Sequence, residues 1–554
     1  MNERKMAAFF QPDRIFLLGT AIISWIAFLL GSVTVIQLLR LPFSRPMLLA
    51  ATALFVILFS GYALKTKRVA QGKSLVLFWV SFLAVVLVAI GISGNVYDYS
   101  YDGQAYHGEA ILQLVNGWNP FYEKIPDTNV HALWLNHYAK GNWIVEASIY
   151  KLTGLYESGK SINLLLIAAN ACIVYYVLSV FNYFNRFVHL LLTFFIAFDP
   201  VNLNMLFAGM IDGHMSSLMS MLTALLVLAF YRPSSAYKVA LVACIIYLAN
   251  IKFTAVPYLG VYGIGLTVLM FLLKKVKVYQ KLFLTYALAC IAAVTIFGCT
   301  SYVYNTIGEG HPFYPLAGKG TANVLPADIV PTNFTEQNRF RNFAIATFSR
   351  SAYSNNYGKP ATLKVPFSVT RKEVERFAFS GVMVGGFGVW FSGILLFGIL
   401  FLILGLRYEK RKEVRLMFLF LMGCILASVF INPGCWWARY VPQLWLIPII
   451  SFILYWQTNK GNIWLARAFY FAVLVNAAII GGVYCLYNFI VTKTVKQQIA
   501  TLQQEQKPLV VNFGNSTSKR IYFINNHIDY RVLPRDSFKT ADTIFRSEVI
   551  YQQR

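Results

Sequence analysis

Charged residues are scarce in this 554-residue chain and make up 13% of it, whereas soluble proteins carry about 25%. Hydrophobic residues account for 57%. Eight uncharged runs are near or above the roughly 20 residues that cross a bilayer as a helix; they span 15–39, 46–64, 74–97, 161–185, 282–307, 377–406, 416–437 and 468–492. This composition excludes a soluble protein. Because the runs do not alternate as barrel strands would, they predict membrane-spanning helices.

Cysteine is also sparse, with seven residues in the whole chain. All seven lie within or at the edges of apolar runs, and none has the spacing of a metal site. We interpret them as small hydrophobic residues, so the sequence indicates neither zinc nor a disulfide framework. The first apolar run is too long for the core of a cleavable signal peptide and is expected to be a true span.

Acidic residues are outnumbered, with 23 Asp and Glu against 48 Lys and Arg, for a net charge of +25. The excess base lies in short clusters between apolar runs, so we do not interpret it as a nucleic-acid-binding surface. Positive charge in short loops marks the cytoplasmic face. Residues 65–73, 274–281 and 407–415 are therefore expected inside with the amino terminus, and the loops 95–160 and 308–376 outside.

Two further apolar regions, 187–231 and 239–273, are interrupted by ionisable residues, namely Asp199, Asp212, His214 and Lys252. Basic residues at both ends of each region predict a helical hairpin that enters the membrane and returns. Their first arms are so short that each reaches only about 18–20 Å, less than a hydrocarbon core of about 30 Å. The charged apices are therefore expected to lie beneath the outer surface and line a cavity. Alternatively, the helices continue past these charges, which pair with one another.

The fold expected from these features is an all-α polytopic membrane protein with about 13 transmembrane helices. Its transmembrane domain covers residues 1–492, and a small α/β-type tail covers residues 493–554. The tail runs Pro508–Phe513 and Lys519–Ile524 have the composition of short strands. Because the tail is too small to bury much core alone, we expect it to pack on the outer loops.

The first outer loop concentrates ionisable and aromatic residues directly after an apolar run. Residues 95–109 contain four Tyr with Asp98, Asp102, His107 and Glu109. The apolar spacing in 110–115 predicts a helix along the membrane surface, with Asp102 near its start. There Asp102 can accept a proton from an incoming hydroxyl as a general base. Alternatively, it caps the helix.

Lys252 and Arg439 are two of the few basic residues expected on the outer face outside the large loops. A guanidinium and an ammonium at that depth would bind a phosphate; alternatively, they snorkel or pair with an Asp. The segment 308–318 contains His311 and Tyr314 between prolines and glycines. This composition predicts a rigid turn, which either walls a substrate site or anchors the loop.

Five segments together resemble the GT-C superfamily of polytopic glycosyltransferases, which use polyprenyl-phosphate sugar donors. They are Asp102-Gly-Gln-Ala-Tyr-His107, Pro200 with Asp212-Gly-His214, Asn250-Ile-Lys-Phe-Thr254, His311-Pro-Phe-Tyr-Pro315 and Ala438-Arg-Tyr-Val-Pro442. The resemblance covers about residues 1–490. It implies a catalytic carboxylate in the first outer loop, which is Asp102 here, with Asp98 as the substitute. Arg439 and Lys252 would bind the donor phosphate. The substrate cavity would be lined by Tyr106, His107, Glu109, Asp212, His214, His311 and Tyr314.

Two departures from the superfamily pattern limit what the resemblance implies. The tail contains no Trp-Trp-Asp motif, so transfer to Asn sequons is not expected. The Asp-Glu or Asp-Asp pair of many members is absent as a dipeptide. We therefore assign no metal ligand and expect no cofactor, while the use of a divalent metal stays open.

The sequence predicts a glycosyltransferase of the hexosyl- or pentosyltransferase type in the inner membrane, with its carboxy terminus outside. The sugar would move from a polyprenyl (pyro)phosphate carrier to a glycan, lipid or surface-polymer acceptor. A secondary transporter or flippase, with its intramembrane charges as coupling sites, is the alternative. A non-catalytic scaffold of envelope assembly is a second. The large outer loops and the lack of an inverted repeat favour the transferase.

Overall fold

The computed structural model describes residues 12–232, 237–325, 329–335, 338–352, 358–458, 460–505 and 507–553. Within these ranges, ten helices are long and apolar enough to cross a membrane. They are α2 (Pro12–Leu38), α3 (Arg45–Lys65), α4 (Lys73–Gly94), α8 (Ser161–Phe181), α11 (Asp212–Tyr231), α13 (Ala255–Leu272), α14 (Val276–Ala292), α18 (Phe391–Tyr408), α19 (Lys412–Ile431) and α21 (Ile463–Glu505). Three shorter apolar helices accompany them, α9 (Arg186–Ala197), α12 (Lys238–Ile251) and α20 (Leu446–Trp456). This is the architecture of a helical membrane protein, the class that the sequence predicts.

Helix packing places α2, α8, α11 and α12 at the centre of the bundle. Helix α2 packs against α8 and α12, and α8 packs against α11. Gly19 of α2 allows a close approach to α8, because a Cβ there would lie 2.8 Å from the Cβ of Cys172. Small residues serve this purpose at helix interfaces in membranes. Helices α3 and α4 instead expose large apolar side chains, including Ile57 and Val88, as lipid-facing helices do.

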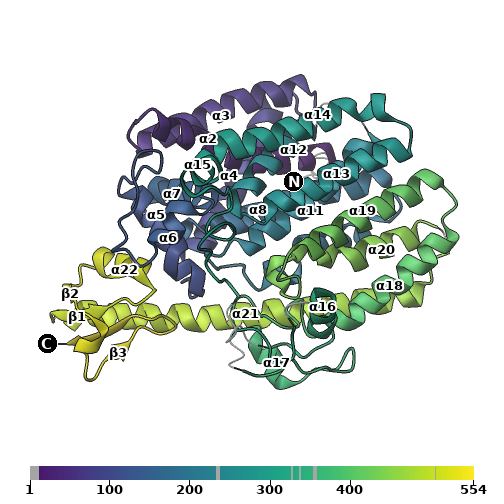
Figure 1. The fold of residues 1–554 in the computed structure, drawn as a ribbon. Coiled ribbons are helices and arrows are strands. Elements are labelled where there is room, and N and C mark those ends of the chain that lie inside the picture. The colour runs from purple at the N-terminus through teal and green to yellow at the C-terminus, as the bar shows by residue number, and fades with distance from the viewer. Residues whose placement is uncertain are drawn as a thin grey trace.

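The short connections that carry the basic clusters gather at one end of the bundle. Figure 1 shows the α13–α14 and α18–α19 connections at the end opposite the C-terminal sheet. Lys275 before α14 and Glu413 of α19 form an ion pair of 2.7 Å there. The first outer loop lies at the sheet end (Figure 1). The basic clusters and the large loop thus lie at opposite ends, as a membrane topology requires.

The two predicted hairpins have the short first arms that the sequence indicates. Helix α9 has 12 residues and α12 has 14. After α9, Asp199 caps the single turn α10 (Pro200–Leu203) by accepting hydrogen bonds from the backbone amides of Val201 and Asn202 at 2.9 and 3.2 Å. Lys252 ends α12 in an extended conformation. The helices therefore stop at these charges.

The first outer loop folds into η1 (Gly103–His107), α5 (Gly108–Val115), α6 (Ala132–His137), α7 (Gly141–Thr153) and the turn η2 (Tyr156–Ser158). Helix α5 packs against α7, and its residues Ala110 and Leu114 are buried. Its polar residue Glu109 is also buried, beneath the C-terminal tail. The helix predicted from the apolar spacing of 110–115 is therefore present, and the tail covers the polar face that carries Glu109.

The second outer loop contains α15 (Tyr304–Glu309), α16 (Arg339–Thr347) and α17 (Arg371–Arg376). This loop continues to Trp390. The sequence predicts a helix over the whole run 377–406, but the first part of that run is not helical. Gly381, Gly385 and Gly388 have φ values of 75°, 61° and 105°. Glycine adopts such left-handed conformations readily, and they end any helix that the apolar composition would favour.

The tail is attached through α21, which has 43 residues and is about 65 Å long at 1.5 Å per residue. The expected domain boundary at residue 492 falls within this helix. Beyond it, β1 (Leu509–Asn512), β2 (Tyr530–Val532), β3 (Asp542–Thr543) and β4 (Ile550–Gln553) form a sheet in the order β2-β1-β4-β3. Figure 1 shows α21 carrying this sheet away from the bundle.

One tail element differs from the prediction. The run Lys519–Ile524, expected as a strand, lies in η8 (Thr517–Lys519) and α22 (Arg520–Asn525). Strands β1 and β2 pair in parallel, and parallel neighbours need a crossover connection, usually a helix. Phe523 of this crossover shares a buried cluster with Tyr97 of the first outer loop and Val495 of α21. Packing of the tail on the outer loop is thus confirmed.

Candidate functional site

Four charged side chains from four distant segments form a continuous chain of contacts, which we call the four-charge cluster: Asp102, Arg439, Asp212 and Lys252. Arg439 Nη1 donates a hydrogen bond to Asp102 Oδ2 at 3.0 Å and lies 3.8 Å from Asp212 Oδ2. Lys252 Nζ binds the other oxygen of Asp212, Oδ1. Two acids alternate with two bases, so the cluster is neutral as a whole.

Local backbone structure explains how each segment presents its charge. Asp102 precedes η1, yet its side chain makes no capping hydrogen bond within the described structure and bonds Arg439 instead. Arg439 projects from the turn η6 (Ala438–Tyr440) between α19 and α20. Asp212 begins α11, and Lys252 ends α12. All four groups thus lie at ends of helices or in turns.

Burial changes along the cluster. The Asp102 and Arg439 side chains are 19% and 16% exposed, whereas those of Asp212 and Lys252 are 4% and 8% exposed. One end of the cluster therefore reaches solvent, and the other is buried. The helices stop at the apex charges, as the first interpretation predicts. Asp212 and Lys252 also pair with each other, as the alternative predicts.

Aromatic rings cover the two cations. The Arg439 guanidinium lies 4.2 Å from the ring centre of Trp437, and Lys252 Nζ lies 4.5 Å from that of Tyr440. Cations attract the faces of aromatic rings in this geometry. Trp437 Nε1 donates to the carbonyl oxygen of Gly381 at 3.2 Å, which ties the ring to the second outer loop. The rings hold the cations in place without neutralising them.

His107 and Tyr106 extend the site on the η1 side. Trp143 Nε1 donates a hydrogen bond of 2.6 Å to His107 Nδ1. Burial lowers the pKa of His107 to about 4, although the carboxylates of Asp102 and Asp212 act in the opposite direction. The imidazole is therefore neutral at pH 7. Because Nδ1 accepts the bond from Trp143, its proton lies on Nε2, which remains a donor. The Tyr106 ring lies 4.2 Å from that of His107.

Asp98, the substitute carboxylate, lies in a different environment. It is buried, and its carboxylate accepts hydrogen bonds from the backbone amide and hydroxyl of Ser100 at 2.9 and 2.7 Å. Its second oxygen accepts from the Gly209 amide at 3.0 Å. Burial raises the pKa of Asp98. These bonds tie the start of the first loop to the α10–α11 connection, so Asp98 holds the segment that presents Asp102.

Glu109 is also separate from the four-charge cluster and faces the tail. It binds Arg520 through both oxygens, with Arg520 Nη2 at 2.9 Å from Oε1, and accepts from the Thr517 hydroxyl at 2.7 Å. Burial acts to raise the pKa of Glu109, but the hydrogen bonds and charge of Arg520 dominate and lower it to about 2. Glu109 is thus a tail anchor.

Within the described structure, the remaining predicted cavity residues form no hydrogen bond or ion pair with the four-charge cluster. His214 is fully buried, and both its ring nitrogens lack a partner among the described residues. His311 Nδ1 accepts from the Phe313 amide at 3.1 Å. The Tyr314 ring packs edge-on against His137 at 4.8 Å. The ring centres of Phe313 and Phe253, the neighbour of Lys252, lie 5.8 Å apart, so this turn packs against the segment that carries Lys252.

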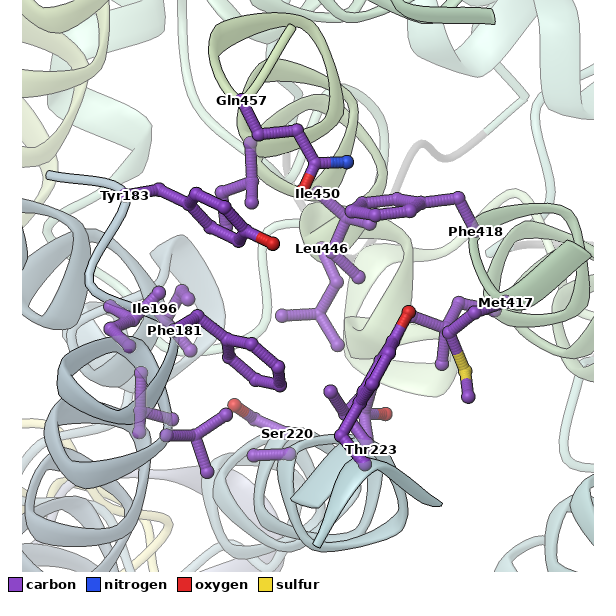
Figure 2. Close-up of a pocket in the computed structure, with 18 of the residues that line it drawn as sticks. Phe181, Tyr183, Ile196, Ser220, Thr223, Met417, Phe418, Leu446, Ile450 and Gln457 are labelled. Carbon is purple, nitrogen blue, oxygen red and sulfur yellow. The ribbon is translucent and has the colours of Figure 1, made fainter. Parts of the chain in front are cut away.

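Two apolar cavities lie elsewhere in the bundle. Figure 2 shows one of about 120 Å³ between α8, α11, α19 and α20, with polar side chains limited to a few such as Ser220, Thr223 and Gln457. A larger groove of about 1010 Å³ opens between α2, α3 and α12. None of the four clustered charges lines either one. The cluster is therefore distinct from both cavities.

Sequence reasoning predicted that the tail packs on the outer loops, but it did not identify Arg520 as the partner of Glu109 or the aromatic rings that cover Arg439 and Lys252. Trp437 and Tyr440 flank Arg439 in the chain, and this adjacency was the available signal for them. Trp143 and Arg520 reach the site region from other segments, and no local pattern marks them. Within the described residues, no group of three or more His, Cys, Asp or Glu is placed to hold a metal.

Comparison with known proteins finds no match to this chain among family models or curated proteins. The chemistry of the site residues is therefore the basis for assigning a function.

Proposed function

We propose that this chain is a GT-C-like glycosyltransferase of the inner membrane. It would move a sugar from a polyprenyl (pyro)phosphate carrier to a glycan, lipid or surface-polymer acceptor on the outer face. The observation that carries the proposal is the hydrogen bond between Asp102 and Arg439 at the solvent-reaching end of a buried charge cluster. This contact supports a pairing in which Asp102 would be the proton acceptor and Arg439 the phosphate-binding cation.

The topology proposed for this function has 13 spans, with the amino terminus in the cytoplasm and the tail outside. The three shorter apolar helices, counted with the ten long ones, support it. The Lys275–Glu413 ion pair supports placing both basic connections on one side. The positive charge of these connections supports a cytoplasmic location for that side, and the four-charge cluster would then face the outer leaflet.

In the proposed reaction, the carrier phosphate displaces Asp102 from Arg439. Phosphate is a strong partner for guanidinium, because two oxygens can accept parallel hydrogen bonds. The exchange frees the Asp102 carboxylate to accept the proton of the acceptor hydroxyl. As the sugar forms a bond to the acceptor oxygen, its bond to the carrier phosphate breaks. Arg439 stabilises the charge of the leaving phosphate.

The other groups have supporting roles in this proposal. Lys252, which pairs with Asp212, contributes positive electrostatic potential at the position proposed for the carrier phosphate. The Nε2–H of neutral His107 donates to a sugar hydroxyl or phosphate oxygen, since Trp143 occupies its other nitrogen. Trp437 and Tyr440 provide aromatic faces beside the cations. Asp98 positions the loop that carries Asp102.

The proposal is tested with purified protein and defined polyprenyl-linked sugars. Asp102→Asn preserves the shape of the side chain and removes the proton acceptor, so transfer should fall by about 10²–10⁴-fold. Asp127→Asn is the matched control, because Asp127 is an exposed carboxylate of the same loop. Transfer by Asp102→Asn at the wild-type rate would exclude Asp102 as the base. Movement of the intact lipid across vesicles without transfer would favour the flippase alternative.

A further inference from the structure

A groove of about 680 Å³ runs along the outer part of α21, apart from the four-charge cluster. Its lining is apolar at one end, with Phe207, Cys485 and Phe489. At the other end it is polar and basic, with Thr492, Lys493 and Lys496. A second hollow of about 260 Å³ adjoins it at Asn95 and Lys496. The groove thus changes from apolar to cationic along a single helix.

The depth of this groove follows from the length of α21. From Ile463 to Lys493 the helix rises about 45 Å, which equals the thickness of a bilayer with its headgroup layers. Leu486 and Phe489, just before the lysines, are highly exposed apolar residues, as expected for a lipid-facing surface. The apolar end of the groove therefore lies at hydrocarbon depth, and Lys493 and Lys496 lie in a headgroup layer.

The two lysines are available to an anion. Lys493 is exposed, and no ion pair joins it to any described residue. Lys496 Nζ donates to the carbonyl oxygen of Asn95 at 3.1 Å, which leaves its charge uncompensated. The carboxylate of Glu157 lines the adjoining hollow, but it is held by Lys160 and Tyr522. The groove therefore presents net positive charge at headgroup depth.

We propose that this groove binds an anionic phospholipid of the outer leaflet. The phosphodiester would lie against Lys493 and Lys496, and an acyl chain would follow Phe207, Cys485 and Phe489. Basic residues attract anionic lipid at a membrane surface, and burial of the chain adds hydrophobic stabilisation. A bilayer phospholipid fits better than the proposed sugar carrier, because no residue of the four-charge cluster lines this groove.

The bound lipid would contact the base of the segment that presents Asp102. Thr492 in the groove accepts a hydrogen bond from the Tyr97 amide at 2.9 Å, and Asn95 and Val96 form part of the lining. These residues lead directly into the first outer loop. The inference requires α21 to span the membrane, but it does not require sugar transfer, so either proposal can fail alone.

Native mass spectrometry of the full-length protein tests the proposal. Wild-type protein in detergent is titrated with phosphatidylglycerol and with phosphatidylcholine, and we expect tighter binding of phosphatidylglycerol. The double variant Lys493→Ala/Lys496→Ala should bind phosphatidylglycerol about 30-fold more weakly, the effect expected of two lysines at an anionic surface. Lys507→Ala/Lys539→Ala is the matched control, because it removes the same charge from exposed tail residues and should bind as wild type does.

Three outcomes would overturn the inference. One is equal binding of the two lipids by wild-type protein, and another is unchanged phosphatidylglycerol binding by the Lys493/Lys496 double variant. The third is displacement of phosphatidylglycerol by an equimolar amount of polyprenyl phosphate, which would assign the groove to the carrier. Because both lysines are exposed, the double variant should fold. A Lys493→Gln/Lys496→Gln variant, which retains polar side chains, provides a second measurement of the same loss.

Discussion

The ion pair of Lys252 and Asp212 predicts a large loss of stability when one partner is removed. Both side chains are almost completely buried, so each charge depends on the other and not on water. Lys252→Met keeps the aliphatic part of the side chain and removes the ammonium. Within the described structure, Arg439 Nη1 at 3.8 Å is then the ionic contact left to Asp212. Removing one partner of a buried ion pair costs about 3–5 kcal/mol, and the longer contact with Arg439 should place the loss toward the lower end of this range.

A double-mutant cycle isolates the pair. Adding Asp212→Asn to Lys252→Met removes the orphaned carboxylate, so the double variant should recover part of the loss, with a coupling of about 0.5–3 kcal/mol. The assay is denaturant unfolding of purified protein in detergent. Arg439→Ala provides the comparison, and its cost should be smaller because Asp102 keeps some contact with water.

The outcome that refutes this reasoning is a Lys252→Met variant that unfolds like wild type. If that variant also lost the use of the lipid donor, Lys252 would be a phosphate ligand and its contact with Asp212 incidental. Early unfolding with normal turnover of the folded fraction would instead assign Lys252 a purely structural role.

Three further predictions follow from other contacts. Arg439→Lys should have a higher donor KM and a lower activity than wild type, because an ammonium lacks the planar fork that engages two phosphate oxygens. Steady-state kinetics at varied donor concentration measures both parameters. The pKa of Glu109 is held at about 2, below its ordinary value of 4.5, so the stabilisation of the tail contact is present above about pH 4.5 and is lost as the pH falls toward 2. Arg520→Ala should abolish this pH dependence in a proteolysis assay of the tail. Cysteines at positions 319 and 275 should be labelled from opposite sides of the membrane, and labelling from one side would contradict the topology.

Much of the membrane architecture could be predicted from local sequence. The short arms α9 and α12 were predicted because each apolar region has basic residues at both ends and is interrupted by charges. The start of α18 could not be predicted from hydropathy, because the glycine conformations at 381–388 are independent of apolar composition. The helix at Arg520–Asn525 was also missed, because the parallel pairing of β1 with β2 creates the need for a crossover.

The candidate site was predicted in part. Asp102, Arg439, Lys252 and Asp212 were chosen separately from their positions, and the structure brings all four together. Asp98 and Glu109 were chosen from the same loop, but the structure places them in separate buried contacts. Residue type alone does not distinguish these cases, because the partner of each carboxylate comes from a remote segment.

The sequence by itself determined the class of this protein, the places where its helices stop at charges, and the end of the bundle at which its basic residues gather. These properties depend on run length and on the cost of charge in lipid, which are local. Only the tertiary structure decided that Asp102 meets Arg439, 337 residues away, and that Arg520 of the tail meets Glu109. Such pairings depend on how the helices and loops pack against one another, and no periodic pattern in the sequence indicates that packing.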